Sequence, residues 1–333
     1  MLFSFIIPLF NRPEEIQELL QSIAAQSYKN FEVIVVEDGS TLKAEDIVKN
    51  FADRFPLQYL YKLNAGPGPA RNYGCEHAGG DYFIFVDSDC LLPPHYLDII
   101  HSHLCTHPLD AFGGPDAAHP SFTPLQKAIS YAMTSFLTTG GIRGRKTHLG
   151  VFHPRSFNMG ISRRVYARTK GFSLMRFGED IELSARIHQE GFSTGLIADA
   201  FVYHRRRTDL KKFFKQVHNS GIARINLYKR HPETLQAVHF FPVCFTLACL
   251  SLPLVGLVSR PLFLAATTLV VLYTVLVFAD AAAQSRSVTV AGLGTVVAYV
   301  QLLGYGSGFL QAVWKRLLLG QEEFSSFQDT FYQ

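Results

Sequence analysis

The stretch YFIFVDSD at residues 82–89 joins five apolar residues directly to an Asp-Ser-Asp triplet. Residues 82–86 are aromatic or aliphatic throughout, which is typical of a strand that is buried on both faces. Three other largely apolar runs precede it, at residues 3–9, 31–36 and 57–63, with helical spacing of apolar residues between them. The alternation predicts an α/β fold built on a mostly parallel sheet with helices on both faces.

Acidic residues stand where two of these strands end, Asp38 after the second and Asp87 after the fourth. The carboxyl ends of parallel strands share one edge of a sheet, and ligands bind at that edge. Asp87 and Asp89 offer the oxygen ligands that Mg²⁺ and Mn²⁺ prefer. An Asp-x-Asp sequence by itself is more often a turn, so this site depends on its neighbours in the sequence.

Five segments in order resemble the motifs of the family 2 inverting glycosyltransferases of GT-A fold, over residues 3–221. They are residues 5–12, 35–40, 64–74, 87–89 and 178–180. The resemblance implies a nucleotide-sugar donor and Mn²⁺ or Mg²⁺ as cofactor, with the metal at Asp89 and His204. A plain surface histidine is the alternative at His204. The implied nucleotide-sugar contacts are Pro8, Asn11, Arg12, Asp38, Asn64, Gly66, Arg71, Asp87, Ser88 and Asn158.

Direct displacement at an anomeric carbon needs a base for the acceptor hydroxyl and stabilisation of the departing diphosphate. The resemblance gives the role of base to Asp180, with Glu179 beside it. A helix N-terminus favours the ionised form of Asp180 and lowers its basicity, and repulsion from the adjacent Glu179 would raise the pKa of Asp180 again. The alternative is that the pair only caps the helix expected over residues 179–189.

Departures from the family pattern bear on the acceptor. Relatives that charge polyprenyl phosphate follow the metal motif with Leu-Gln, whereas this chain continues Cys90-Leu91-Leu92. The Gln-x-x-Arg-Trp motif of processive synthases is also absent, because the single tryptophan is Trp314. We therefore expect non-processive transfer to a hydroxyl of a membrane-associated or lipid-linked glycan or a glycolipid. A polyprenyl-phosphate glycosyltransferase and a non-catalytic nucleotide-sugar-binding membrane protein remain the alternatives.

The chain changes character after residue 236. Residues 240–258, 261–283 and 288–310 are almost free of charge, and each approaches the ~20 residues that cross a bilayer as a helix. We expect a GT-A-like catalytic domain at 1–235, two or three membrane helices at 236–316 and an amphipathic tail at 317–333. Prolines in the first stretch leave open that it is re-entrant or interfacial, followed by a spanning pair.

Basic residues flank the apolar region at 229–230 and 315–316. Because loops rich in Lys and Arg stay in the cytoplasm, this predicts a multi-pass protein of the cell inner membrane, with the catalytic domain facing the cytoplasm. A net charge of +4 over 333 residues is too small to indicate a nucleic-acid partner. Arg143, Arg145 and Lys146 form either a loop that closes over the diphosphate or a solvated loop.

Overall fold

The computed structural model describes residues 1–140, 152–175, 177–205 and 208–324. It contains two compact units, residues 1–119 with 152–205 and residues 120–140 with 208–324. The compact units do not follow the boundary expected at residue 235, because two helices before that position pack with the apolar helices that follow it. The expected basic loop at 143–146 and most of the expected tail lie outside the described residues.

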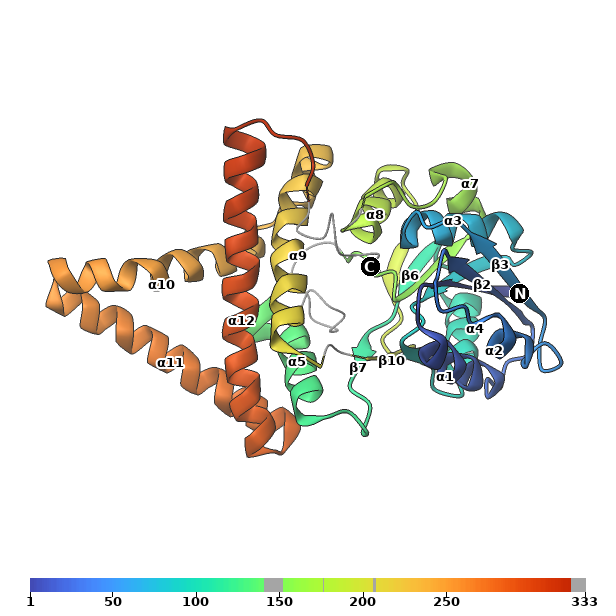
Figure 1. The fold of residues 1–333 in the computed structure, drawn as a ribbon, viewed down its shortest axis with the longest axis horizontal. Coiled ribbons are helices and arrows are strands. Elements are labelled where there is room, and N and C mark those ends of the chain that lie inside the picture. The colour runs from blue at the N-terminus through green and yellow to red at the C-terminus, as the bar shows by residue number, and fades with distance from the viewer. Residues whose placement is uncertain (141–151, 176, 206–207, 325–333) are drawn as a thin grey trace. The chain divides into compact units, whose positions relative to one another are not determined.

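The first unit is built on a seven-stranded sheet in the order β3-β2-β1-β4-β8-β6-β9 (Figure 1). The first four strands in this order, β3, β2, β1 and β4, pair parallel with one another. Strand β8 is antiparallel to both of its neighbours, and β6 is parallel to β9. The mostly parallel α/β sheet is therefore confirmed. The strands are β1 Phe3–Leu9, β2 Phe31–Asp38, β3 Leu57–Lys62, β4 Tyr82–Val86, β6 Ala111–Gly113, β8 Asn158–Ser162 and β9 Thr194–Leu196.

Helices cover both faces because alternate side chains of each central strand point to opposite sides. Phe5 and Ile7 of β1 belong to one buried cluster with residues of α1, α2 and α4, whereas Ile6 belongs to another with residues of α3, α7 and α8. Strands β1 and β4 are largely apolar because each is buried on both faces, whereas the edge strand β3 is only partly buried. The helices are α1 Pro13–Ala24, α2 Glu45–Lys49, α3 Pro67–His77, α4 Tyr96–Thr106, α7 Arg163–Thr169 and α8 Glu179–Gln189.

A second, three-stranded sheet lies beyond the end of β4, in the order β5-β10-β7. It consists of β5 Cys90–Leu91, β10 Val202–His204 and β7 Asp116–Ala117, and β10 pairs antiparallel with β5. His204 lies directly opposite Cys90 in this pairing. The small sheet therefore brings a residue from late in the chain beside the Asp-Ser-Asp triplet.

The second unit is helical. Its helices are α5 Pro124–Thr134, α6 Phe136–Thr139, α9 Leu210–Arg230, α10 Phe241–Val258, α11 Arg260–Ser285 and α12 Val288–Ala312, and α12 continues as a π-helical turn at Val313–Leu318. Helix α12 packs against α5, α9, α10 and α11, and Figure 1 shows it beside α9. Three segments are long and apolar enough to cross a membrane: Ala237–Val258, Arg260–Ser285 and Val288–Leu318.

Candidate active site

The predicted donor residues follow three neighbouring parallel strands. Asn11 and Arg12 come after β1, Asp38 ends β2 and Asp87 comes after β4. Because β2, β1 and β4 are adjacent in the sheet, these residues share its carboxyl edge. Pro8 lies one position before the end of β1, opposite Val36 of β2.

Asp38 is 3% exposed and organises the segment that follows β3. Its carboxylate accepts hydrogen bonds from the Gly66 and Ala65 backbone N–H groups, at 2.8 and 3.1 Å, while Asn64 donates to its backbone oxygen at 2.8 Å. Lys62 Nζ lies 2.6 Å from the same carboxylate. Sequence reasoning missed Lys62, although two parallel strands in register place the last residue of β3 opposite Asp38.

Asn11 shapes the turn after β2. Its side-chain oxygen accepts hydrogen bonds from the Thr41 and Leu42 backbone N–H groups at 2.8 and 2.9 Å, and its own N–H donates to Ser40 Oγ at 2.8 Å. Its φ of 52° is left-handed, a conformation that Asn tolerates better than most residues. Asn11 therefore holds the two strand ends together.

Arg71 links the first aspartate of the triplet to the acidic pair of α8. It is 3% exposed, and its guanidinium lies 2.7 Å from Asp87 and 3.3 Å from Glu179. The Arg71 guanidinium also lies 5.2 Å from the Phe172 ring centroid, within the range of a cation–π contact. One buried cation therefore holds two carboxylates that are distant in the sequence.

Glu179 has the most perturbed carboxyl of the acidic pair. Burial raises its pKa to about 7, the charge of neighbouring Asp180 adds to the rise, and Arg71 opposes it. A buried carboxylate is disfavoured because it loses its hydration, so its proton is retained to higher pH. The sequence reasoning placed a raised pKa on Asp180, whereas the raised pKa found is that of Glu179, with burial as its largest cause.

Asp180 lies in the first turn of α8 and is only partly covered, with 14% of its side chain exposed. Its carboxylate accepts the Ile181 N–H at 2.8 Å and the Ser156 N–H at 3.4 Å. Arg155 lies 3.6 Å away. The N-cap of α8 is Gly178, without a side-chain cap hydrogen bond, so Asp180 accepts an N–H within the first turn rather than capping the helix. Part of its carboxylate stays accessible. Sequence reasoning missed Arg155, because nothing local links it to α8.

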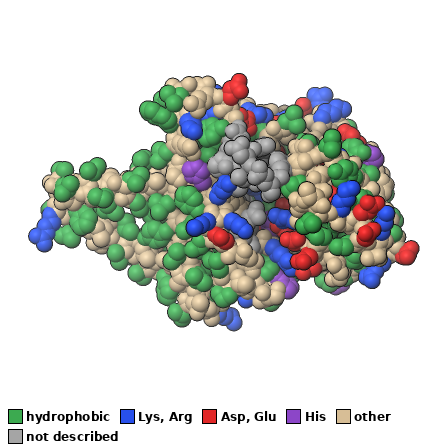
Figure 2. All heavy atoms as spheres, in the orientation of Figure 1, with side chains coloured by type: hydrophobic (Ala, Val, Ile, Leu, Met, Phe, Trp, Pro, Cys, Tyr) green, Lys and Arg blue, Asp and Glu red, His purple; other side chains and the backbone are tan. Residues whose placement is uncertain are grey.

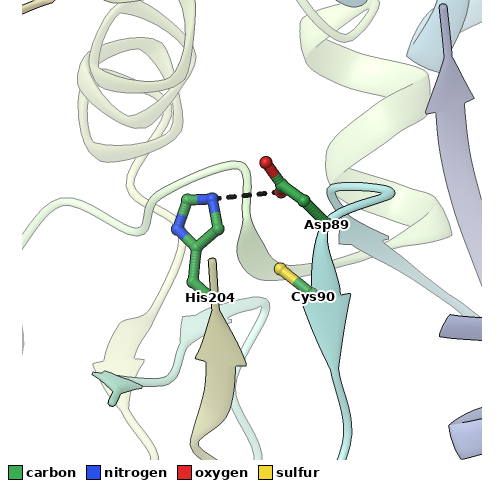
Figure 3. A group of neighbouring side chains, drawn as sticks. All are labelled: Asp89, Cys90 and His204. Carbon is green, nitrogen blue, oxygen red and sulfur yellow. Dashed lines mark ion pairs between the residues drawn. The ribbon is translucent and has the colours of Figure 1, made fainter. Parts of the chain in front are cut away.

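Asp89 lies between Arg12 and His204. Figure 3 shows its ion pair with His204. Arg12 Nη1 is 2.6 Å from one carboxylate oxygen and His204 Nε2 is 3.2 Å from the other. Burial by itself would raise the pKa of Asp89, but the charges of His204 and Arg12 outweigh burial and hold that pKa well below its usual range. Asp89 is therefore ionised at neutral pH.

The side chains around Asp89 suit a divalent ion. Asp89 Oδ1 faces only His204 Nε2, at 3.2 Å, and His204 Nδ1 is buried without a hydrogen-bond partner among the described residues. The ligand atoms of Asp89, Cys90 and His204 all lie within 4.8 Å of one another. Burial raises the pKa of the Cys90 thiol well above its usual value, so Cys90 stays protonated and is a poor ligand. The remaining carboxylate and imidazole fit Mn²⁺.

Two further predicted donor residues are buried. Ser88 is 4% exposed and Asn158 is 1% exposed. The Asn158 side chain accepts a hydrogen bond from Tyr96 at 2.7 Å and donates to the backbone oxygens of Ala200 and Pro115 at 2.9 and 3.3 Å. With both ends of its amide engaged, Asn158 joins β8 to the segments before β7 and β10.

The strand order, the aspartates at the strand ends and the following apolar helices define a GT-A-like domain with a helical membrane region. Residues 4–169 match the family model described as glycosyl transferase family 2. The chain belongs to this family.

Curated relatives match over part of the chain. An uncharacterized glycosyltransferase of Haemophilus influenzae is 34% identical over 138 residues, which cover 39% of this chain and 55% of that protein. Glycosyltransferase GlyA of Streptococcus pneumoniae is 35% identical over 106 residues, which cover 32% of this chain and 15% of that protein. The matches therefore span about half the length of these relatives or less.

Solved structures match over nearly the whole chain. Mannosyltransferase PcManGT from Pyrobaculum calidifontis, in complex with GDP-Man and Mn²⁺, has a TM-score of 0.64 at 18% identity, covering 94% of this chain and 87% of that one. TarS 1-349 of S. aureus, in complex with UDP-GlcNAc, has a TM-score of 0.53 at 19% identity, covering 99% and 95%. At these identities the likeness establishes the fold.

Proposed function

We propose that this protein is a metal-dependent inverting glycosyltransferase. It moves one sugar from a nucleotide-diphosphate-sugar to a hydroxyl of a membrane-associated glycan or glycolipid. The observation that carries the proposal is the grouping of two arginine-paired aspartates with a second acidic pair at one sheet edge: Asp87 and Asp89 with Arg71 and Arg12, and Glu179–Asp180 reached through Arg71. Its neighbours of similar fold bind GDP-Man with Mn²⁺ or UDP-GlcNAc, which supports a nucleotide-sugar donor.

The donor would bind across the carboxyl ends of β2, β1 and β4. Asp38 and the Asn64–Gly66 segment that it orders would hold the nucleoside. Arg12, partly exposed at 32%, is placed to move from Asp89 to a diphosphate oxygen. Guanidinium groups suit this role because they bind phosphate oxygens with two parallel donors.

Asp89 and His204 would hold Mn²⁺, which, when bound, offsets the charge that develops on the departing diphosphate. Asn158, whose amide is used within the fold, would position β8 beside the donor rather than contact it.

Asp180 would accept the proton of the acceptor hydroxyl, because its carboxylate is partly accessible. Arg155 and the Ser156 N–H would hold this carboxylate in place. Glu179 would adjust the charge of the cluster, since a pKa of about 7 lets it gain or lose a proton near neutrality.

The acceptor would reach the site from a membrane. Three apolar helices follow the catalytic unit, and this supports a membrane-associated acceptor. We place the protein in the cell inner membrane as a multi-pass protein with its catalytic unit in the cytoplasm, on the distribution of basic residues around the apolar region.

The first test is a donor screen on the detergent-solubilised full chain with Mn²⁺ and a membrane lipid extract. Release of nucleoside diphosphate is followed over a panel of UDP-, GDP- and dTDP-sugars. We expect release from one donor, and loss of that release with EDTA and in Asp89→Ala. Asp53→Ala serves as the matched control, because Asp53 is an exposed aspartate on the turn after α2.

The acceptor class is tested with Asp180→Asn. Transfer to a hydroxyl should fall by orders of magnitude, whereas transfer to a phosphate, which is already ionised, should change far less. Retained transfer would therefore favour a polyprenyl-phosphate acceptor. Binding of a nucleotide-sugar without release from any donor would favour the non-catalytic alternative.

A further inference from the structure

The three apolar helices differ in how much protein covers them. In the most apolar 18-residue windows, 11% of the residues of the first segment and 6% of those of the second are buried, against 44% in the third. Figure 2 shows hydrophobic side chains gathered over the projecting α10–α11 hairpin. Its leucines are open to the outside, with Leu257 and Leu269 exposed by 85% and 67%. A bilayer is the natural cover for such a surface, because a water-exposed apolar patch of this extent is unfavourable.

Helix α12 is instead joined closely to the basic helix α9. A Cβ atom at Gly308 would lie 2.0 Å from the His218 backbone oxygen, and one at Gly221 would lie 2.1 Å from the Tyr305 backbone oxygen. These glycines allow the two backbones to touch. His218 also contacts Ser307 and Gln311 at 3.0 and 2.8 Å, so the contact surface includes polar pairs beside its apolar ones.

The partnership with α9 argues against a bilayer crossing by α12. The two helices run in the same direction, because the C-terminal end of each contacts that of the other through Arg316 and Asn226 at 2.9 Å. Helix α9 begins with Lys211 and Lys212, and it carries Arg224 in its interior. If α12 crossed the hydrocarbon layer, α9 would have to enter it with these charges, which is strongly unfavourable.

Polar and aromatic contacts mark the base of the hairpin. Asp280, near the end of α11, accepts hydrogen bonds from Tyr131 of α5 at 2.8 Å and from Ser135 at 2.9 Å. Closer to the tip, Tyr273 lies between Phe245 of α10 and Tyr299 of α12, with ring centroids 5.6 and 6.3 Å away.

The length of the hairpin matches a bilayer. Helix α10 has 18 residues, which rise about 27 Å, and the stretch from Arg260 to Asp280 rises about 30 Å. The hydrocarbon core is ~30 Å thick. Arg260 stands at the tip, while the base carries Arg286 and the basic ends of α9 and α12.

We infer that, of the three apolar helices, α10 and α11 cross the bilayer as a hairpin, whereas α12 lies at the cytoplasmic surface with α5 and α9. Two crossings return the chain to the side on which it started, as the basic residues at the base require. This assignment differs from the alternative considered from the sequence, in which the first apolar segment was re-entrant or interfacial and the other two spanned the bilayer.

Single-cysteine labelling in spheroplasts of a bacterial host tests this topology. The background replaces Cys105, Cys244 and Cys249 and keeps the buried Cys75 and Cys90. Single cysteines are then placed at three exposed positions: Arg260→Cys at the tip, Arg286→Cys at the α11–α12 turn and Glu322→Cys after α12. Pro261→Cys is a second tip variant, in case Arg260→Cys does not fold. A membrane-impermeant maleimide is added before or after permeabilisation.

We expect equal labelling of the tip cysteine before and after permeabilisation, and labelling of the other two only after it. The Arg286→Cys and Glu322→Cys variants control for each other, since they flank α12. Labelling of Glu322→Cys in intact spheroplasts would show that α12 crosses and would overturn the inference. Failure to label either tip variant before permeabilisation, with normal labelling after it, would show that the hairpin does not cross.

Discussion

Replacing Glu179 by Gln should remove a dependence of stability on pH that runs opposite to the usual one for a carboxylate. In the folded protein the pKa of Glu179 is about 7, compared with 4.5 for an unperturbed glutamate. Between these two values the folded state holds a proton that the unfolded state has released. The free energy of unfolding therefore falls as pH rises through this window, and the full contribution is present below pH 4.5.

The magnitude follows from the size of the shift. A difference of about 2.5 units, at 1.36 kcal/mol per unit, corresponds to about 3 kcal/mol. The conversion applies because the Glu179 side chain is only 11% exposed. The amide introduced by Glu179→Gln has no proton to release in this range. From pH 4.5 to 8 the wild type should therefore lose about 3 kcal/mol of unfolding free energy relative to the variant. The altered contact with Arg71 changes the stability of the variant itself, so the prediction concerns how the difference moves with pH and not its absolute value.

The assay is differential scanning calorimetry of both proteins in one detergent, from pH 4.5 to 8. At roughly 2–4 °C per kcal/mol, the midpoint difference should move by about 6 °C or more across the window. Comparison at each pH cancels the titration of all other groups. Glu76→Gln, an exposed glutamate on α3, should track the wild type at every pH. A midpoint difference between Glu179→Gln and wild type that does not change with pH would refute the reasoning.

Two further predictions concern the same unit. Arg12→Ala removes the guanidinium that is paired with one oxygen of Asp89, and because this pair is partly exposed it contributes ~1 kcal/mol. Isothermal titration without nucleotide should therefore show Mn²⁺ binding about fivefold tighter in this variant. The control Arg168→Ala should leave the Mn²⁺ affinity unchanged. Gly160→Ala should lower the free energy of unfolding, measured by denaturant titration, by about 1–3 kcal/mol or more, because its Cβ would lie 2.0 Å from the Phe112 ring. The control Gly79→Ala should cost far less, because its Cβ would meet only the flexible Glu32 side chain, at 3.4 Å. Unchanged metal affinity in the first variant, or equal stability of the two alanine variants, would contradict these predictions.

Local pattern predicted most of the catalytic fold. The apolar runs at residues 3–9, 31–36, 57–63 and 82–86 correspond to β1, β2, β3 and β4. Such runs are recognisable because strands of a parallel sheet that is covered on both faces are nearly continuous in apolar residues. The helix expected over residues 179–189 is α8. The short strands β5, β7 and β10 were beyond prediction as a sheet, since strands of two or three residues have no pattern of their own and depend on distant partners.

The aspartates of the candidate site were found from sequence because they end long apolar runs. Their partners were not all found. Lys62 is placed by the register of two strands, and Arg155 is placed by packing against the first turn of a helix that begins more than twenty residues later. Neither relation leaves a mark in the local sequence, since it depends on how separate elements meet.

The sequence by itself determined the class of fold and the three apolar helices, and it selected the carboxyl edge of the sheet as the candidate site, because periodicity, strand-end residues and hydropathy are local properties. Only the tertiary structure decided that Arg71 joins Asp87 to Glu179, that burial shifts the pKa of Glu179 rather than leaving the pair equivalent, and that α12 is covered by α9 while α10 and α11 are not. Burial and the meeting of distant charges are set by packing, which no single segment encodes.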